Sequence, residues 1–329
     1  MALCSNSELA RGTFVMEVLA NHLLCDEHYL LRLHLVGGGF PATQPGQFVQ
    51  LQCRGVSDRG GLRTVDWDDS GWLKLTGAEL KGAEPLLRRP MSLAGRCDTD
   101  EGVELEIIYR VVGAGTRWLS AVGTGETLGV LGPLGNAFTI RGDVKPLAAL
   151  VGGGVGIPPM IYLAATLRAV GSKKTVAFCG MRSANLLPLG FVPGANVSAD
   201  GRPTSSIADF ARYGAASVVT TDDGSLGVRG FVTDALEKWI DRQADAAERL
   251  VVYVCGPERM MRKAGEMCIA RGVECQLLLE RYMACGMGTC QSCVCKIRAD
   301  NPQGWEYKLC CSDGPVFGAG EVVWEGPLR

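Results

Sequence analysis

The sequence predicts an antiparallel β-barrel, followed by a doubly wound parallel α/β domain and a small C-terminal unit rich in cysteine. The first 140 residues contain short apolar strands separated by glycine and proline, a pattern typical of all-β folds. From residue 145 strands alternate with helices, as they do in parallel sheets. Six of the 14 cysteines crowd residues 285–311, and such crowding indicates a metal site. We therefore place the three units at residues 1–143, 144–279 and 280–329.

Composition argues against several classes of protein. The 329 residues carry 33 Lys+Arg against 35 Asp+Glu, and this balance disfavours binding to nucleic acid or to an anionic membrane surface. Residues 146–165 are uncharged, but glycines and prolines in the middle favour a strand, a turn and a helix over a membrane span. The N-terminus lacks the pattern of a signal peptide. We expect a cytoplasmic protein with no nucleic-acid partner and no membrane partner.

The barrel is predicted from five strands, at residues 12–19, 29–35, 47–52, 103–111 and 127–131. A polar run rich in glycine and aspartate, at about residues 54–84, interrupts them. We interpret this run as a long hairpin insertion, and a catalytic role for its carboxylates is disfavoured because acidic turns are usually solvated.

In the α/β domain, strands are expected at 147–151, 175–179, 217–220, 250–255 and 273–279, with helices at 158–169, 231–242 and 258–270. A glycine-rich turn joins the first strand to the first helix, and its glycines are Gly152, Gly153, Gly154 and Gly156. Such a turn can hold a pyrophosphate on the helix N-terminal amides at the carboxyl end of a parallel sheet. The run is not a G-x-G-x-x-G motif, so a tight turn without a ligand is the alternative.

Two further strand ends extend this nucleotide hypothesis. Cys255 and Gly256 end one strand, where the thiol either lies against a nicotinamide ring or packs as a small hydrophobic residue. Asp222 and Asp223 lie in a polar loop that either binds ribose or simply turns the chain. NADH and NADPH both stay open, because Arg182, after the second strand, suits a 2′-phosphate.

The cysteine spacing Cys285-x4-Cys290-x2-Cys293 matches the plant-type 2Fe-2S arrangement. Gly286 and Gly288 allow the backbone to curl around a cluster, with amide N–H groups free to point at its sulfurs. A redox cluster is therefore the favoured interpretation of this segment.

The fourth ligand is open on spacing, because Cys310 and Cys311 are adjacent. Cys295 is disfavoured, since it alternates with Cys293 on a predicted strand and points to the other face. A structural zinc site is the alternative for the whole segment, although zinc frameworks favour short C-x2-C pairs.

These motifs, in this order, resemble a known family. Arg89–Ser92 resembles the R-P-x-S motif of ferredoxin reductase-like flavoproteins, Tyr109–Thr116 the flavin segment that follows it, and Leu131–Phe138 the stretch that closes the barrel. Glu280–Cys295 and Cys311–Phe317 resemble the electron transfer subunits of class 1B dihydroorotate dehydrogenases. The resemblance covers nearly the whole chain apart from the insertion.

The resemblance implies a set of cofactor contacts. The cluster ligands would be Cys285, Cys290, Cys293 and, because it directly precedes x-Asp-Gly-Pro-Val-Phe, Cys311. The FAD contacts would be Arg89, Pro90, Met91, Ser92, Tyr109, Arg110, Val111, Gly113, Gly115 and Thr116. In the family the Arg contacts the FAD phosphates, the Ser lies by the isoalloxazine, and the Thr hydroxyl and glycine amides bind the pyrophosphate.

The resemblance also implies an activity and a partner. NAD(H) exchanges a hydride with FAD, and FAD exchanges single electrons with the cluster. An FMN-containing catalytic subunit oxidises dihydroorotate in pyrimidine (UMP) synthesis, in a heterotetramer with two copies of each chain. Two alternatives stay open: a reductase subunit of a hydrogenase, sulfur reductase or ferredoxin-NADP transhydrogenase, and a zinc-stabilised adaptor without enzymatic activity.

Overall fold

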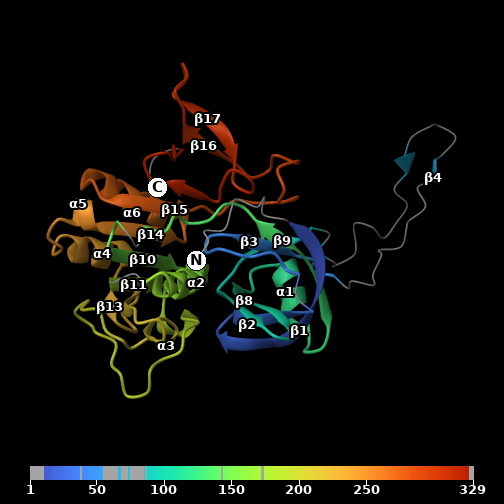
Figure 1. The fold of residues 1–329 in the computed structure, drawn as a ribbon, viewed down its shortest axis with the longest axis horizontal. Coiled ribbons are helices and arrows are strands. Elements are labelled where there is room, and N and C mark those ends of the chain that lie inside the picture. The colour runs from blue at the N-terminus through green and yellow to red at the C-terminus, as the bar shows by residue number, and fades with distance from the viewer. Residues whose placement is uncertain are drawn as a thin grey trace.

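The chain is known here from a computed structural model that describes residues 11–37, 39–54, 66–67, 73–74, 85, 87–141, 144–171 and 174–325. Two seven-stranded sheets lie side by side, and the cysteine-rich segment lies above the junction between them (Figure 1). The predicted fold class, an antiparallel barrel followed by a doubly wound α/β domain, is confirmed.

The first sheet is antiparallel and curls into a barrel with the order β6-β3-β9-β1-β2-β8-β7. Its strands are β1 (Gly12–Cys25), β2 (His28–Val36), β3 (Phe48–Leu51), β6 (Arg89–Ser92), β7 (Gly95–Thr99), β8 (Gly102–Arg110) and β9 (Thr127–Leu134), and helix α1 (Ala114–Ser120) follows β8. Alternate residues fill the interior, among them Leu31, Leu33, Leu105 and Ile107, all fully buried. Burial of such side chains drives this unit to fold.

The expected insertion is described only in part. Strand β4 (Asp66–Trp67) pairs antiparallel with β5 (Leu73–Lys74), as a hairpin requires. Apart from residue 54 and these two strands, the 54–84 prediction falls on residues outside the described ranges.

The second sheet has the order β13-β12-β11-β10-β14-β15-β18. Its strands are β10 (Leu147–Gly153), β11 (Lys174–Met181), β12 (Ala216–Thr221), β13 (Val228–Arg229), β14 (Leu250–Cys255), β15 (Glu274–Leu278) and β18 (Val316–Gly318). Its helices are α2 (Ile157–Ala169), α3 (Ala208–Ala211), α4 (Val232–Ile240), α5 (Ala246–Arg249) and α6 (Glu258–Ala270), with short 3-10 turns at Gly154–Gly156 and Ala184–Leu186. All neighbouring strands are parallel except β18, which pairs antiparallel with β15.

Helices cover both faces of this sheet. Leu150 of β10 packs in one core with Ile161 of α2, whereas the next residue, Val151, packs in another with Leu236 of α4. This alternation explains why the strands are apolar on both faces. Because neighbouring parallel strands end at the same edge, the predicted nucleotide-binding turns are brought together there.

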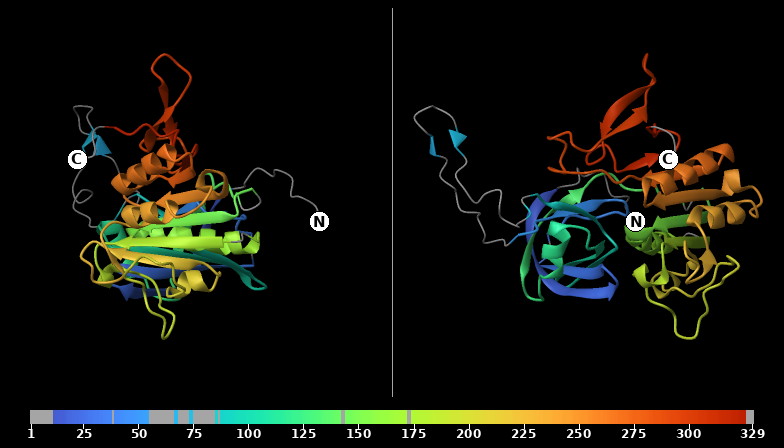
Figure 2. Two further views of the ribbon diagram at one scale, coloured as in Figure 1. Left: turned by 90° about the vertical axis from the view of Figure 1, so that its left-hand side faces the viewer. Right: turned by 180° about the vertical axis from the view of Figure 1, so that it is seen from behind.

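The last part of the chain forms a hairpin and then returns to the sheet. β16 (Val294–Arg298) pairs antiparallel with β17 (Trp305–Leu309), and the hairpin stands above the two sheets in every view (Figure 2). The chain then adds β18 to the edge of the parallel sheet. Among the described residues, no helix combines the length and the apolar character needed to cross a membrane.

Candidate functional site

The cysteine-rich loop brings four thiols together as two pairs. The backbone N–H groups of Met287 and Cys290 each donate to the Cys285 sulfur at 3.4 Å. Farther along, the Cys311 thiol is hydrogen-bonded to that of Cys293. Within the described ranges no three His, Cys, Asp or Glu side chains gather tightly enough to hold a single metal ion. Two thiol pairs with amides turned toward sulfur fit a two-iron cluster, which is held by four thiolates.

The exposed pair carries a polar neighbour that the sequence analysis did not identify. The Ser292 hydroxyl oxygen lies 3.2 Å from the Cys290 sulfur and accepts the Ala284 N–H at 3.2 Å. A hydroxyl has one proton and two lone pairs, so Ser292 can donate to a thiolate at Cys290 while it accepts the Ala284 N–H. This contact, the largest of several hydrogen bonds, lowers the pKa of the Cys290 thiol to about 6.

The two remaining cysteines of the segment point away from these pairs. Cys310 is fully buried, and its sulfur lies 3.4 Å from the Leu279 carbonyl oxygen, so burial raises the pKa of its thiol. Cys295 contacts the Lys308 carbonyl oxygen across the hairpin at 3.5 Å, and burial raises its pKa to about 11. Both thiols therefore face packed protein.

The barrel holds the return segment, residues 311–317, in place. Asn136, just beyond β9, donates to the carbonyl oxygens of Asp313 at 3.1 Å and Val316 at 2.9 Å, and accepts the Val316 N–H at 2.8 Å. The Asp313 carboxylate accepts the Leu309 N–H at 2.6 Å and so closes the turn that carries the two adjacent cysteines. The Asp-Gly-Pro-Val-Phe motif is thus anchored to another unit of the chain.

The flavin motif predicted from sequence lies on β6, an edge strand of the barrel sheet as described. Its four residues, Arg89, Pro90, Met91 and Ser92, are all partly exposed. Arg89 reaches the start of α1, where a Cβ added to Gly115 would lie 2.6 Å from its Nε atom. The structure therefore places the arginine of one predicted flavin motif directly over the glycine turn of the other.

The turn after β8 is shaped by its own side chains. The Thr116 hydroxyl accepts the N–H groups of Val112 at 2.9 Å and Gly113 at 3.1 Å, and donates to the Gly113 carbonyl at 3.2 Å. Its single proton is thereby committed within the turn. The amides of Ala114, Gly115 and Thr116, in the first helical turn, have no carbonyl of their own helix to bind.

Three further predicted flavin residues lie at the end of β8. The Tyr109 hydroxyl donates to Asn21 at 3.0 Å inside the barrel, and burial raises its pKa. Arg110 forms an ion pair with Glu27 at 2.6 Å, and the Val111 N–H donates to the Glu27 carbonyl at 2.8 Å. The side chains of Tyr109 and Arg110 therefore secure the strand end.

The cluster loop rests on the barrel beside the flavin motif. Gln50 of β3 stands opposite Pro90 of β6 in the strand register. The Gln50 amide nitrogen lies 3.5 Å from the Ala284 carbonyl oxygen, and a Cβ added to Gly286 would lie 2.5 Å from the same nitrogen. Gln50 thus joins the flavin motif to the loop that carries Cys285.

The predicted nucleotide turns meet at the carboxyl ends of β10 and β14. Four glycines there have no room for a side chain: Gly152, Gly153, Gly156 and Gly256. A Cβ on Gly156 would lie 2.2 Å from the Cys255 carbonyl oxygen, and one on Gly256 would lie 2.9 Å from the Gly153 carbonyl oxygen. Gly154 differs, because the space around it is open and its φ is +57°. Close packing of two turns explains most of this glycine run.

The other predicted nucleotide residues divide between an exposed loop and a buried strand end. Asp223 accepts the Ser225 N–H at 2.9 Å and its hydroxyl at 2.6 Å, and these bonds lower the pKa of the carboxyl group. The Asp222 N–H donates to the Met181 carbonyl at 3.0 Å, which ties this loop to the end of β11. Cys255 is buried, and burial raises the pKa of its thiol.

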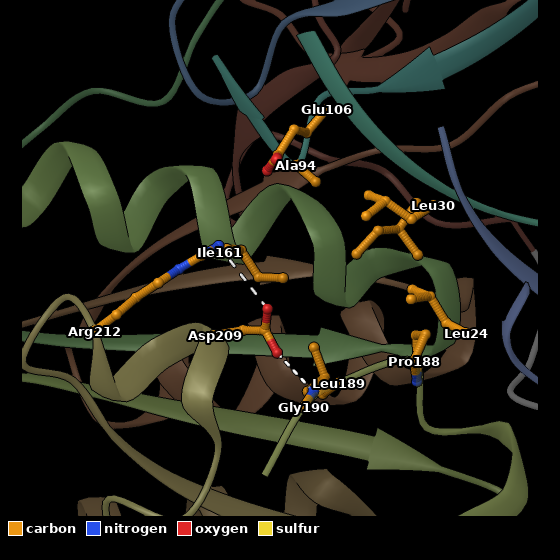
Figure 3. Close-up of a pocket in the computed structure, with 11 residues that line it drawn as sticks. Leu24, Leu30, Ala94, Glu106, Ile161, Pro188, Leu189, Gly190, Asp209 and Arg212 are labelled. Carbon is orange, nitrogen blue, oxygen red and sulfur yellow. Dashed lines mark hydrogen bonds and ion pairs between the residues drawn. The ribbon is translucent and has the colours of Figure 1, made fainter. Parts of the chain in front are cut away.

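A cavity of about 260 Å³ lies between the barrel and the α/β unit (Figure 3). Its walls combine apolar and charged side chains: Leu24 and Leu30 face Ile161 and Leu189, and Glu106 and Arg212 also line it. Asp209 lies at one side, where it accepts the Gly190 N–H at 2.8 Å. None of the site residues predicted from sequence lines this cavity.

Comparison with known proteins finds relatives that match most of the chain. Residues 280–323 match the iron-sulfur cluster binding domain of dihydroorotate dehydrogenase B. The dihydroorotate dehydrogenase B (NAD(+)) electron transfer subunit of Caldanaerobacter subterraneus subsp. tengcongensis is 34% identical over 93% of this chain and 97% of its own length. The subunit of the same description from Geobacillus thermodenitrificans is 39% identical over 94% of this chain and 97% of its own length. Among solved structures, an NADH-dependent reduced ferredoxin-NADP oxidoreductase has the same fold, with a TM-score of 0.68 and 24% identity, over 95% of this chain and 91% of its own.

Proposed function

The chain belongs to the family of dihydroorotate dehydrogenase B electron transfer subunits, and from this membership we propose its function. It carries electrons between the FMN of a dihydroorotate dehydrogenase catalytic subunit and NAD, through a 2Fe-2S cluster and FAD, in UMP synthesis. One observation supports the proposal most directly: the loop that carries Cys285 and Cys290 contacts Gln50, which lies beside the Arg-Pro-Met-Ser strand. When bound, FAD converts hydride transfer into the single-electron transfer that the cluster accepts.

Four thiols are proposed to hold the cluster: Cys285, Cys290, Cys293 and Cys311. Cys285 and Cys290 form one pair, and Cys293 and Cys311 form the other. The donor set is entirely thiol, which suits iron-sulfur ligation. The backbone N–H groups that already point at the Cys285 sulfur would stabilise negative charge on the cluster.

FAD is proposed to lie along β6 and the turn after β8. Its contacts would be Arg89, Pro90, Met91, Ser92, Tyr109, Arg110, Val111, Gly113, Gly115 and Thr116. Arg89 supplies a cation beside the first-turn amides of α1, and together they suit a pyrophosphate. Thr116 would act by ordering the turn, since its hydroxyl proton is already donated to Gly113.

NAD(H) is proposed to lie along the carboxyl ends of the parallel strands. Its contacts would be Gly152, Gly153, Gly154, Gly156, Asp222, Asp223, Cys255 and Gly256. Gly154 borders open space, and Cys255 lies one strand away at the same edge. These positions would place a nicotinamide ring near the barrel and the adenosine half near the Asp222 loop.

We predict that NADH is preferred to NADPH by roughly tenfold in kcat/KM, because Asp223 stays ionised beside the expected ribose and repels a 2′-phosphate. Arg182 lies next to this loop, where its carbonyl accepts the Asp223 N–H at 3.2 Å. Steady-state kinetics with both nucleotides measures the ratio, and Asp223→Asn should shift it toward NADPH. Equal use of both nucleotides by the unaltered protein would refute the charge argument.

Ser292→Ala is predicted to lower the midpoint potential of the cluster, because the hydroxyl proton stabilises the more negative, reduced form. A net hydrogen bond of about 0.5–1.5 kcal/mol corresponds to roughly 20–60 mV for one electron. A redox titration followed by EPR gives the potential, and Ser292→Thr, which keeps the hydroxyl, is the matched control. An unchanged or higher potential in the alanine variant would contradict the prediction.

We propose a cytoplasmic heterotetramer with two copies of each chain, in which the catalytic subunit docks over the cluster loop. Tyr282 is 95% exposed and Met287 46% exposed at that loop, so two large side chains with apolar surface face solvent there. The deciding experiment is co-expression with an FMN-containing catalytic subunit, followed by an assay for NAD reduction that depends on dihydroorotate. A co-purified pair that oxidises dihydroorotate without reducing NAD would refute the proposed function.

A further inference from the structure

We infer that Gln50 is a positioning residue for electron transfer, whose side chain sets the separation between the flavin motif on β6 and the loop that carries Cys285. The inference rests on the proposed function. No sequence motif contains Gln50, and its assignment comes from strand register, burial and one close approach.

The strand register places Gln50 on the face where it can act. Val49 and Leu51 are buried in the core of the barrel, so Phe48 and Gln50 face outward from β3. Phe48 packs in the same core cluster as Cys293 and the other buried cysteines of the C-terminal segment. The C-terminal segment therefore packs against the outer face of β3.

The same face continues onto the flavin motif. Directly opposed residues of an antiparallel pair share a face, and Gln50 stands opposite Pro90 while Phe48 stands opposite Ser92. Opposed side chains in such pairs have Cβ atoms about 5 Å apart. Gln50 is thus one strand away from the proposed flavin contacts Pro90 and Ser92.

The contact above Gln50 leaves it little freedom. Its side chain is only 1% exposed, and its amide nitrogen donates a long hydrogen bond to the Ala284 carbonyl at 3.5 Å. Gly286 comes so close that an added Cβ would lie 2.5 Å from the amide nitrogen and 2.6 Å from the amide carbon. Displacing a buried amide from its backbone partner costs free energy, so this contact fixes the distance between β3 and the loop that carries Cys285.

The first test replaces Gln50 with leucine, which keeps the volume but removes the donor to Ala284. We expect flavin-to-cluster electron transfer to slow by several-fold, since the rate of electron transfer falls as the separation between donor and acceptor grows. Flavin reduction by NADH, measured in the same stopped-flow experiment, should stay within about twofold of the unaltered protein. The EPR spectrum of the reduced cluster should shift as well, because one wall of its loop has changed.

The second test uses two glycines of the same loop. Gly286→Ala and Gly288→Ala both place a side chain at positive φ, +71° and +92°, but only the first meets Gln50. At Gly288 the nearest contact of an added Cβ is 3.5 Å from Ser312. Both variants therefore carry backbone strain, and only Gly286→Ala carries the clash. Gln50→Ala alone should slow electron transfer, as Gln50→Leu does. Combined with Gly286→Ala it should add less than its own effect, because the clash is removed, whereas combined with Gly288→Ala its effect should add in full.

Three outcomes would overturn the inference. These are an unchanged flavin-to-cluster rate and EPR spectrum in Gln50→Leu, loss of the cluster from that variant with flavin retained, or equal effects of Gln50→Ala on both glycine variants. The second outcome would assign Gln50 to assembly of the loop. The dihydroorotate assay on the unaltered pair separates these results from a failure of the proposed function.

Discussion

Cys311→Ser is expected to abolish the cluster, whereas Cys310→Ser retains it. Adjacent cysteines are the closest possible matched pair, yet their sulfurs face different surroundings. The Cys311 thiol is hydrogen-bonded to Cys293, while the Cys310 sulfur contacts the Leu279 carbonyl at 3.4 Å in the packed core. Loss of a direct ligand should lower iron and sulfide content by more than about tenfold, since loss of an outer partner alone typically costs 10–100-fold in metal affinity.

Iron and sulfide analysis with visible absorption measures the outcome. Both variants should keep FAD that NADH reduces, because the proposed flavin contacts lie on β6 and the turn after β8. Cys290→Ser is the positive control for loss of the cluster. If Cys310→Ser lost iron and Cys311→Ser kept it, the proposed ligand set would be wrong.

Gly156→Ala is expected to destabilise the α/β unit by about 3 kcal/mol or more, the upper range for overpacking a close-packed site. The added methyl group would lie 2.2 Å from the Cys255 carbonyl oxygen and 2.4 Å from its carbonyl carbon. Both atoms belong to the backbone of β14, so relief requires the ends of β10 and β14 to separate. NAD(H) binding should weaken along with stability, because the proposed nucleotide contacts lie on those ends.

Gly154→Ala is the matched control, two residues earlier in the same turn. Its added methyl group meets nothing within 4 Å, so the cost is limited to the left-handed backbone at φ +57°, about 1–2 kcal/mol. Calorimetric unfolding and KM for NADH should both rank Gly156→Ala as the more damaging change. Equal effects of the two substitutions would contradict the crowding argument.

The sequence predicted the large elements well, because hydrophobic period and glycine punctuation are local signals. The strand 250–255 and the helix 258–270 were predicted with the bounds that the structure has. β6 was missed as a strand, since it contains Pro90 and all four of its residues are half-exposed, unlike a buried strand. β18 was missed because three residues are too few to show any period.

Site residues could be predicted from sequence only where they form part of a known motif. The spacing of three cysteines identifies them as ligands: Cys285, Cys290 and Cys293. No such pattern marks the single polar residues whose partners depend on tertiary contacts, namely Gln50, Asn136 and Ser292. Gln50 sits between Val49 and Leu51, and its polarity there was the one local hint. The role of Thr116 within its own turn likewise depends on hydroxyl geometry that no pattern of residues encodes.

β18 links metal loading to solubility. Without it, β15 would end the parallel sheet with unpaired backbone groups and the buried side chains of Leu277 and Leu278, the kind of edge on which chains aggregate. The segment that covers this edge, residues 316–318, begins five residues after Cys311 along the chain. We expect a chain whose cluster is missing to hold this cover less firmly, so that a shortage of iron would lower the yield of soluble protein in addition to removing electron transfer.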